Sequence, residues 1–378
     1  MKRLVALVIL TKNSTSHTSP VMLITRKLTK DKRPISDLRL LNTRIKRRNT
    51  TTPLLRDIFS ILGNSRCQTL SCLDLKDAFH SIRLNSKSKE YCGILPYYGS
   101  DHYRYEVLPM GLSISPCRWM QYINSLLDTI PNRSNYLAIM DDLLIHSKKK
   151  KHYTLIEDLL KSLISHGIKL SPKKCQLFRK EIVYMGTIFT IKGNRIQIQP
   201  LKTRIDGILN TPKPKTPKDC KSFCGAVNYL KMFCPELQKL LEPIYELTKK
   251  NMPFHWHKVQ DDAFLEIKER LKHFPILTLP IVGGRYILYS DTSRKHSGST
   301  LWQIQEGKPR LIGYASKTLP KACSNYSVTE LEIYGLWRNL ELWQFWLGSN
   351  EFDAVVDHNA IVQILKCETF FAHFFFRQ

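Results

Sequence analysis

The pattern of apolar and polar positions predicts strands and helices in a recurring order in the first half of the chain. A strand that ends near Asp74, followed by a turn and a short helix, is predicted by residues 68–82, QTLSCLDLKDAFHSI. A helix that runs to about Asp128 is predicted by residues 108–130, LPMGLSISPCRWMQYINSLLDTI. Ser115 suits its N-cap and Pro116 suits its first helical position.

Two adjacent aspartates interrupt an apolar run at residues 136–147, YLAIMDDLLIHS. Neighbouring side chains on a strand face opposite ways, so Asp141 and Asp142 can share one site only if the backbone turns there. Asp tolerates turns well, whereas an unpaired buried carboxylate is costly. We therefore predict two half-strands, 136–140 and 143–145, joined by a tight hairpin with its tip at Asp141 and Asp142.

A helix and a further strand complete this set. Residues 154–167, TLIEDLLKSLISHG, have leucines and an isoleucine at helical spacing, and Gly167 is placed to end the helix. Another strand is predicted by residues 181–190, EIVYMGTIFT. The order strand, helix, hairpin, helix, strand is that of a split βαβ, ferredoxin-like sheet. Such a sheet would bring Asp74 beside the Asp141 and Asp142 hairpin.

Composition adds a class of partner. Lys and Arg outnumber Asp and Glu by 58 to 32, the net charge is +26, and the basic residues are spread along the whole chain. A polyanion is the expected partner, and nucleic acid is the first choice because neutralised phosphates release counterions. A basic structural protein would have a similar composition.

Cysteines and hydropathy indicate a cellular setting. The ten cysteines are scattered without a CxxC pair, which is typical of reduced thiols inside the cell. A zinc site made of Cys220, Cys224, His255 and His257 is disfavoured, because their spacing matches no zinc pattern. No apolar run approaches the roughly twenty residues of a membrane span, so we expect no membrane association.

Three carboxylates at one sheet edge would suit a hard cation. Mg²⁺ is typically held by one or two carboxylates, with substrate phosphates and water completing its shell. Two such ions about 4 Å apart can activate an attacking hydroxyl and stabilise a leaving oxygen, which is the chemistry of nucleotidyl transfer. Taken singly, Asp74 could simply end a strand, and Asp141 and Asp142 could be turn residues. Their order on a basic chain favours the metal site.

A series of motifs resembles the reverse transcriptase of retroviruses and gypsy-type long-terminal-repeat retrotransposons. The motifs, in chain order, are LDLKDAFHSIRL, LPMGLSISP, IMDDLLIHS, LSPKKCQLFRKEIVYMGTIFT and DCKSFCGAVNYLKMFCPELQKLLEPIYELTKK. The resemblance extends from about Ser19 to the end of the chain.

The resemblance implies an α+β protein, a right-hand polymerase followed by a ribonuclease H-like α/β domain. It implies fingers and a ferredoxin-like palm at 1–190, a helical thumb at 191–252, a connecting segment at 253–284 and the ribonuclease H-like domain at 285–378. The fingers are expected to be clipped, since the family has a helical segment before the part that matches SPVMLITRK.

The resemblance also assigns roles at the polymerase site. Asp74 and Asp141 would bind both of two Mg²⁺ ions, and Asp142 would be the third acid. Phe79 matches the bulky residue that blocks a nucleotide 2′-hydroxyl, the group that distinguishes RNA from DNA. Its alternative reading is a core aromatic residue on a short helix.

Triphosphate and primer contacts are implied by two further segments. The family pattern gives triphosphate contacts to Arg33 and to Arg26 or Lys27, although a solvated basic hairpin would look the same. The neighbouring Asp37, Arg39 and Asn42 are expected to be structural. The hairpin that positions the primer's 3′ end matches Tyr184, Met185 and Gly186, which could otherwise belong to an ordinary core strand.

Two positions depart from the family pattern. Met110 stands where retroviral enzymes have a Gln that contacts the incoming nucleotide, while retrotransposon relatives often have an apolar residue there. Ile139 replaces the usual Tyr of the Tyr-x-Asp-Asp motif. This exchange removes an aromatic contact near the primer and leaves the metal ligands intact.

A second set of acids occurs near the C-terminus. Three antiparallel strands (RYILYSDTS, GSTLWQIQ and PRLIGYASK), a long helix from about Val328 to Leu347 and a strand ending at Asp357 are predicted in that order. The order resembles ribonuclease H, in which Asp291, Glu332 and Asp357 would be the first three of four acids that bind two Mg²⁺ ions.

The neighbouring Glu330 is expected to face solvent. The chain ends twenty-one residues after Asp357, before a fourth acid. We therefore expect an incomplete nuclease that binds metal weakly.

Our leading hypothesis is an RNA-directed DNA polymerase of a retrotransposon or endogenous retroviral element. It would join deoxynucleotides to a primer on an RNA or DNA template, alongside other segments of a Pol polyprotein. We expect it inside the cell, in the cytoplasm or in a virus-like particle. The alternative is a decayed or repurposed copy that binds nucleic acid without catalysis, which Ile139 and the two chain ends favour.

Overall fold

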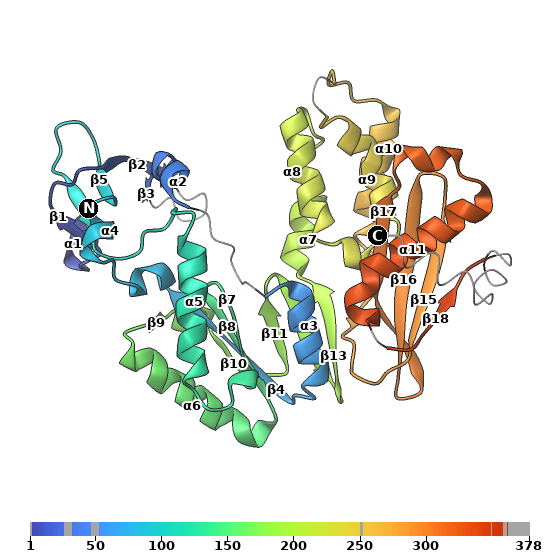
Figure 1. The fold of residues 1–378 in the computed structure, drawn as a ribbon, viewed down its shortest axis with the longest axis horizontal. Helices are drawn as coiled ribbons and strands as arrows, with labels where there is room; N and C mark the ends of the chain where they lie inside the picture. The colour runs from blue at the N-terminus through green and yellow to red at the C-terminus, as the bar shows by residue number, and fades with distance from the viewer. Residues whose placement is uncertain are drawn as a thin grey trace. The chain divides into compact units, whose positions relative to one another are not determined.

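The protein is described by a computed structural model that covers residues 2–25, 32–46, 53–249, 252–348, 350–357 and 361. The chain forms two compact units (Figure 1). The first comprises Met1–Ile58 and Cys67–Ile182, and the second comprises Phe59–Arg66 and Val183–Gln378. The four domain ranges expected from the sequence stay predictions.

One part of the first unit is a sheet with two helices packed on it. Its strand order is β10-β4-β8-β7, and the short β9 also pairs with β4. Buried side chains of α5 and α6, among them Trp119 and Leu159, form one hydrophobic core with Leu73 and Leu143 of the sheet. The elements are β4 (Thr69–Lys76), η1 (Ala78–Ser81), α5 (Ser115–Asp128), η2 (Arg133–Asn135), β7 (Tyr136–Ile139), β8 (Asp142–Ser147), α6 (Lys149–Ser165), β9 (Lys169–Leu170), η3 (Pro172–Lys174) and β10 (Gln176–Arg179).

Three local predictions in this part are corrected. The strand that closes the sheet is β10, because 181–190 is split between two strands of another sheet. The hairpin tip is Met140 and Asp141, since Ile139 pairs with Asp142 and Met140 adopts a left-handed φ of 51°. The N-cap of α5 is Ile114, and the Ser115 hydroxyl donates instead to the Pro109 carbonyl at 2.8 Å.

A second sheet of the first unit has the order β1-β6-β5-β2-β3. It encloses a separate core that includes Leu10, Ile94 and Tyr105. The elements are α1 (Lys2–Ala6), β1 (Leu10–Lys12), β2 (Thr18–Thr25), β3 (Lys32–Ser36), α2 (Arg39–Arg44), α4 (Ser86–Lys89), β5 (Gly93–Leu95) and β6 (Tyr103–Tyr105).

The second unit contains a sheet of order β11-β12-β13-β14 with helices around it. The β11–β12 hairpin turns at Met185 and Gly186, which is where the predicted strand 181–190 divides. The elements are α3 (Leu55–Asn64, which begins in the first unit), β11 (Glu181–Tyr184, likewise), β12 (Thr187–Lys192), β13 (Arg195–Pro200), α7 (Lys202–Leu209), α8 (Pro217–Asn228), η4 (Lys231–Phe233), α9 (Leu237–Glu246), α10 (Lys258–Arg270) and β14 (Leu277–Thr278).

The last part of the second unit is a sheet of order β17-β16-β15-β18 with α11 packed on it. The β15–β18 pair is parallel and the other pairs are antiparallel. Ser327 and Glu330 form a capping box that starts α11. The elements are β15 (Tyr286–Thr292), β16 (His296–Gln305), β17 (Lys308–Thr318), η5 (Lys321–Asn325), α11 (Val328–Leu347) and β18 (Phe352–Val355).

Candidate functional site

The first cluster of acids lies at one end of the β4–β8 pair. Antiparallel register sets Asp74 opposite Asp142, so these two residues are direct neighbours across the strands. Asp141 lies in the two-residue turn just before Asp142, and its carbonyl accepts a hydrogen bond from the Leu75 amide at 2.7 Å. The backbone therefore brings the three aspartates together as the sequence predicts, with the turn shifted by one residue.

Charge in this cluster is only partly balanced. Burial raises the pKa of Asp141 and of Asp142, and the negative charge of Asp74 raises both further. One oxygen of Asp141 is buried and has no hydrogen-bond partner among the described residues. Buried carboxylate oxygens normally find a partner, so an unpartnered one suits a cation ligand.

Lys174 is a member of this cluster that sequence reasoning missed. Its Nζ lies 3.1 Å from one carboxylate oxygen of Asp74 and 3.3 Å from the other. Its positive charge lowers the pKa of Asp141 and of Asp142 and so opposes the effect of burial. The signal was the Lys pair in LSPKKC just before β10, but the contact joins residues 100 positions apart.

Phe79 and Met110 lie in the same unit as these acids. Phe79 is half-buried on η1, and its ring packs edge-on against Trp119 with 6.5 Å between centroids. Met110 is also half-buried. The Asn42 side chain holds the chain just after Met110, because it donates to the Gly111 carbonyl at 2.9 Å and accepts from the Ser113 amide at 2.7 Å.

The other predicted nucleotide contacts are less defined. Arg26 and Lys27 lie outside the described residues. Arg33 pairs with Ile24 in the β2–β3 ladder, and its side chain is outside the described part. Ile139, the departure from the family motif, is buried in β7 with 4% of its surface exposed.

The predicted primer-positioning residues form a tight turn in the second unit. Tyr184 ends β11 and is buried, whereas the Met185 side chain is 38% exposed. Met185 and Gly186 both have left-handed φ angles, 51° and 71°, which is the geometry of a two-residue type I′ hairpin turn.

The second cluster of acids is the more compact one. Tyr289 of β15 pairs with Val355 of β18 in parallel register, so Asp291 and Asp357 leave these two strands at the same level. Glu332 approaches from α11. Among the described residues, these three form the one group of metal-ligating side chains whose ligand atoms all lie within 4.8 Å of one another.

The helix can approach this closely because α11 has a glycine at position 335. A Cβ at Gly335 would overlap the side chain of Thr292 on β15. Further along the same helix face, the Asn339 amide donates to Ser290 Oγ at 2.8 Å and the Trp343 indole donates to Ser299 Oγ at 2.9 Å. These residues were missed, although their four-residue spacing was a usable signal for one helix face.

Glu332 is the buried member of this cluster. Burial raises its pKa to about 7, and the charges of Asp357 and Asp291 act in the same direction. No ion pair links any of the three acids to a described Lys or Arg. Glu330 is exposed, as expected, and its side chain also accepts a hydrogen bond from the Ser327 amide in the helix cap.

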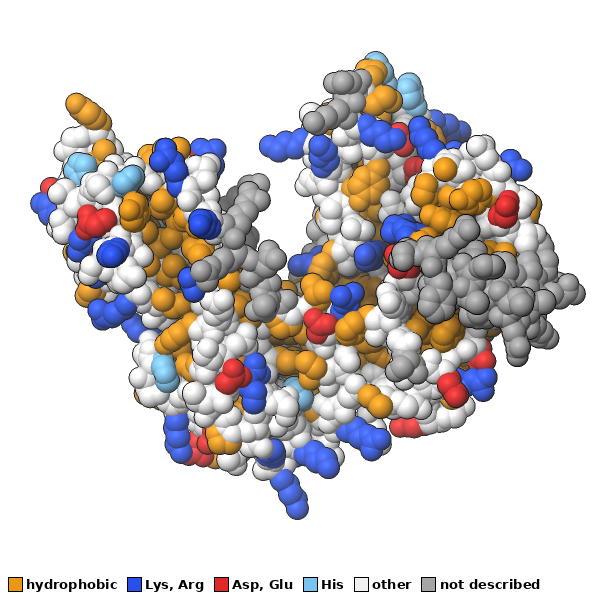
Figure 2. Space-filling view, viewed as in Figure 1, with side chains coloured by type: hydrophobic (Ala, Val, Ile, Leu, Met, Phe, Trp, Pro, Cys, Tyr) orange, Lys and Arg blue, Asp and Glu red, His pale blue; other side chains and the backbone are white. Residues whose placement is uncertain are grey.

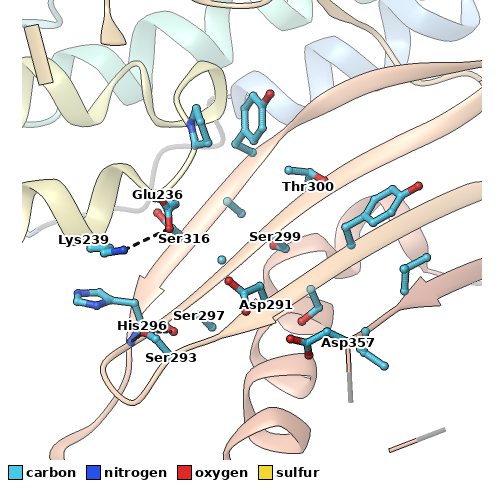
Figure 3. Close-up of a pocket in the computed structure, with 18 residues that line it drawn as sticks. Glu236, Lys239, Asp291, Ser293, His296, Ser297, Ser299, Thr300, Ser316 and Asp357 are labelled. Carbon is cyan, nitrogen blue, oxygen red and sulfur yellow. Dashed lines mark hydrogen bonds and ion pairs between the residues drawn. The ribbon is translucent and has the colours of Figure 1, made fainter. Parts of the chain in front are cut away.

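A cavity of about 480 Å³ adjoins these acids (Figure 3). Asp291 and Asp357 line it together with the Tyr289 and Tyr314 side chains. His296 lines it too, and its Nε2 lies 3.2 Å from a carboxylate oxygen of Glu242 on α9. The acids thus open into a space that a substrate can enter.

Basic side chains are scattered over the visible face of the protein (Figure 2). Acidic side chains are fewer on this face, in keeping with the net charge of +26. Among the described residues, none of the helices combines the length and the apolar character that crossing a bilayer requires.

Comparison with known families gives two matches along the chain. Residues 21–189 match the family described as reverse transcriptase (RNA-dependent DNA polymerase). Residues 256–354 match the family described as the ribonuclease H-like domain found in reverse transcriptase. The predicted family is therefore confirmed.

Similar proteins include transposon polyproteins. The chain is 29% identical over 347 residues to the transposon Tf2-7 and Tf2-3 polyproteins of Schizosaccharomyces pombe (strain 972 / ATCC 24843). The match covers 91% of this chain and 25% of each relative, so the chain spans about a quarter of their length.

Solved structures with this fold include the foamy viral protease-reverse transcriptase. Its complex with dsDNA matches with a TM-score of 0.80 at 21% identity, over 96% of this chain and 74% of that one. Its complex with an RNA/DNA hybrid matches with a TM-score of 0.77 at 20% identity, over 95% and 48%. The predicted fold class is thereby confirmed.

Proposed function

We propose that this chain is an RNA-directed DNA polymerase that adds deoxynucleotides to a primer 3′-hydroxyl at Asp74, Asp141 and Asp142. The observation that carries the proposal is the β4–β8 register, which sets Asp74 opposite Asp142, next to Asp141, whose buried carboxylate oxygen has no partner among the described residues. Membership of the reverse transcriptase family supports the same chemistry.

The acids fit Mg²⁺, because they offer only carboxylate oxygens and one of these is buried and unpartnered. Asp74 and Asp141 would hold two ions, with Asp142 as the third acid. When bound, the ions would supply activation of the hydroxyl and charge stabilisation at the phosphate. The chain's own contribution is geometric. The Leu75 amide donates a hydrogen bond to the Asp141 carbonyl, and this bond fixes the turn in place before substrate binds.

Other residues would bind the substrates. Phe79 would limit space at the sugar, Met110 would contact the nucleotide, and Arg33 with Arg26 or Lys27 would bind the triphosphate. Tyr184, Met185 and Gly186 would position the primer. The foamy viral structures in complex with dsDNA and with an RNA/DNA hybrid support a primer and template as partners here, as does the net charge of +26.

The second cluster extends the proposal to the RNA strand of a hybrid. Asp291, Glu332 and Asp357 would hold Mg²⁺ for hydrolysis of RNA, since they bring three oxygen ligands within 4.8 Å of one another. As part of the same proposal, both reactions take place in the cytoplasm or in a virus-like particle, together with other Pol segments.

Primer extension on an RNA template with Mg²⁺ tests the polymerase. We expect extension by the wild type and a loss of about a thousandfold in Asp141→Asn, because one metal ligand is gone. Asp128→Asn is the matched control, since Asp128 is an exposed aspartate of the same unit, paired with Arg133. It should extend like the wild type.

The same preparations should be tested for binding to the labelled primer and template. If neither the wild type nor Asp141→Asn extends a primer that both bind with salt-sensitive affinity, the polymerase proposal is wrong. The chain would then be a nucleic-acid-binding protein without catalysis.

A further inference from the structure

The Met185–Gly186 turn of the second unit is held by two helices through both of its carbonyl groups. The Tyr229 hydroxyl, just after α8, donates to the Met185 carbonyl. The Leu201 amide, at the start of α7, donates to the Gly186 carbonyl at 3.3 Å. Thr187 Oγ1 lies 3.1 Å from the same Tyr229 hydroxyl, so that hydroxyl is held from a second side. A turn fixed in this way presents its surface with little freedom.

Arg204 of α7 packs against this turn and against the same tyrosine. Its Cζ lies 3.9 Å from the centroid of the Tyr229 ring. A Cβ added at Gly186 would come within 2.8 Å of Arg204 Cζ and Nη2, so the guanidinium occupies the space that the glycine leaves open. The guanidinium is therefore positioned by a ring and a bare backbone.

The charge of Arg204 is not neutralised within the described part of the protein. The side chain is exposed, and no described carboxylate forms an ion pair with it. The first turn of α7 contains no acidic residue and carries a second cation, Lys202. Positive side chains near a helix N-terminus are unfavourable by themselves, and an anion bound there would relieve this.

The geometry also leaves the useful donors of the guanidinium available. Stacking on Tyr229 uses a face of the planar group, while its N–H donors point outward from its edge. Two of these donors can bind two oxygens of one phosphate side by side. Because the group is already positioned, binding costs less side-chain entropy than it would for a free Lys or Arg.

We propose that Arg204, stacked on Tyr229 and packed against the Met185–Gly186 turn, binds a backbone phosphate of a nucleic-acid strand. The choice of nucleic acid rests on the proposed function, whereas the cation and its support are features of the fold. Arg204 is the phosphate-binding residue, and Tyr229 acts through it as a positioning residue.

The test is binding of a 5′-fluorescein-labelled primer annealed to an RNA template, measured by anisotropy in EDTA over a range of salt concentrations. For Arg204→Met we expect Kd to rise about tenfold at 0.1 M salt, and the slope of log Kd against log salt to fall by about 1. Arg204→Lys keeps the charge without the planar fork, so it should keep the slope and recover part of the affinity. Tyr229→Phe keeps the ring and loses the bond to the turn, and it should weaken binding by a few-fold.

Lys321→Met is the control for simple loss of charge, because Lys321 is exposed on η5 of the same unit. It should change Kd by less than about twofold and leave the salt slope unchanged. If Arg204→Met keeps the wild-type salt slope, the proposal is wrong. This holds whether the variant keeps its affinity or loses affinity and melting temperature together. The second result would mean that Arg204 has a structural role only.

Failure of this proposal can be told apart from failure of the polymerase. EDTA prevents metal-dependent extension, so the Arg204 effect can be seen in a chain that never extends a primer. Conversely, a chain that extends primers while Arg204→Met binds with the wild-type slope disproves the phosphate contact and leaves the polymerase intact.

Discussion

Each unit has a cluster of three acids, two of them on or next to neighbouring strands, and the two clusters differ in where the third acid comes from. In the first unit, Asp74 and Asp142 face each other across an antiparallel pair, and the adjoining turn supplies Asp141. In the second, Asp291 lies near the end of β15, Asp357 follows the parallel strand β18, and a helix supplies Glu332.

The source of the third acid decides how the charge is balanced. The first cluster is open enough for the exposed Lys174 side chain to reach Asp74. The second cluster is closed by α11, so Glu332 is only 7% exposed and has no described cation as a partner. Its pKa is raised to about 7, mainly by burial. The helix-borne acid therefore makes a tighter cluster whose negative charge has no described cation beside it.

The largest expected effect separates the two clusters by function. Asp142→Asn should reduce primer extension about a thousandfold, because a carboxylate of the first cluster is lost. It should leave unchanged the rise in melting temperature that we expect Mg²⁺ to cause in the second unit. Asp291→Asn should abolish that rise and keep primer extension within about twofold of the wild type. Calorimetry with and without Mg²⁺, alongside extension assays, checks both.

A reciprocal loss would contradict this division. If Asp291→Asn stops extension while the protein remains folded, the two clusters are not independent in function.

The next effect concerns stability and pH. The pKa of Glu332 is raised in the folded protein from 4.5 to about 7, so this group favours folding below pH 4.5 and loses that contribution as pH rises through 7. In EDTA at pH 8, Glu332→Gln should therefore be more stable than the wild type by about 2 kcal/mol, and at pH 4 the two should be equal. Thermal unfolding at the two pH values measures the difference.

Mg²⁺ should reverse the order at pH 8. The wild type should gain stability because the ion binds the ionised acid, whereas Glu332→Gln should gain little. Equal stability of the two proteins in EDTA at pH 8 would refute the raised pKa.

Much of the second cluster was accessible from sequence pattern. The helix from Val328 to Leu347 was predicted with the bounds observed, since its apolar spacing is a local signal. The strands around Asp291 and Asp357 alternate clearly, so their order could be predicted too.

The remaining features depend on long-range contacts. The turn was placed one residue late, because cross-strand register sets Met140 in its left-handed conformation. The strand predicted at 181–190 was divided for a similar reason, since Met185 and Gly186 both turn there. Lys174 was missed because its partner, Asp74, lies 100 residues away. Local patterns carry no information on such pairs.

A third prediction addresses how the second cluster is closed. Gly335→Ala should destabilise the protein by about 2 kcal/mol, because the new methyl group overlaps Thr292 and forces α11 away from β15. The displaced helix should also carry Glu332 away from Asp291, so the Mg²⁺-dependent rise in melting temperature should shrink. Thermal unfolding with and without Mg²⁺ measures both effects.

Gly225→Ala is the matched control. Gly225 is also inside a helix of the second unit, and nothing lies within 4 Å of the position its Cβ would take. Alanine there should stabilise the protein by about 0.5 to 1 kcal/mol. Similar destabilisation by both substitutions would mean that the overlap with Thr292 is not the cause of the effect at Gly335.

The smallest effect would make the first cluster resemble the second. In the wild type, the Lys174 ammonium lies 3.1 Å from Asp74, and its charge lowers the pKa of Asp141 and of Asp142. Lys174→Met removes this cation. Because Lys174 is exposed, the changes in Mg²⁺ requirement and in primer extension should be modest, about two- to fivefold. At pH 8 the Mg²⁺ concentration for half-maximal extension should fall, since a competing cation is gone. At pH 6 extension should weaken, since the pKa of both acids rises further and protonated acids bind metal poorly.

Lys161→Met is the control. It removes a lysine paired with Glu157 on α6, and it should change neither quantity. An Mg²⁺ requirement that rises at both pH values would instead show that Lys174 assists the reaction.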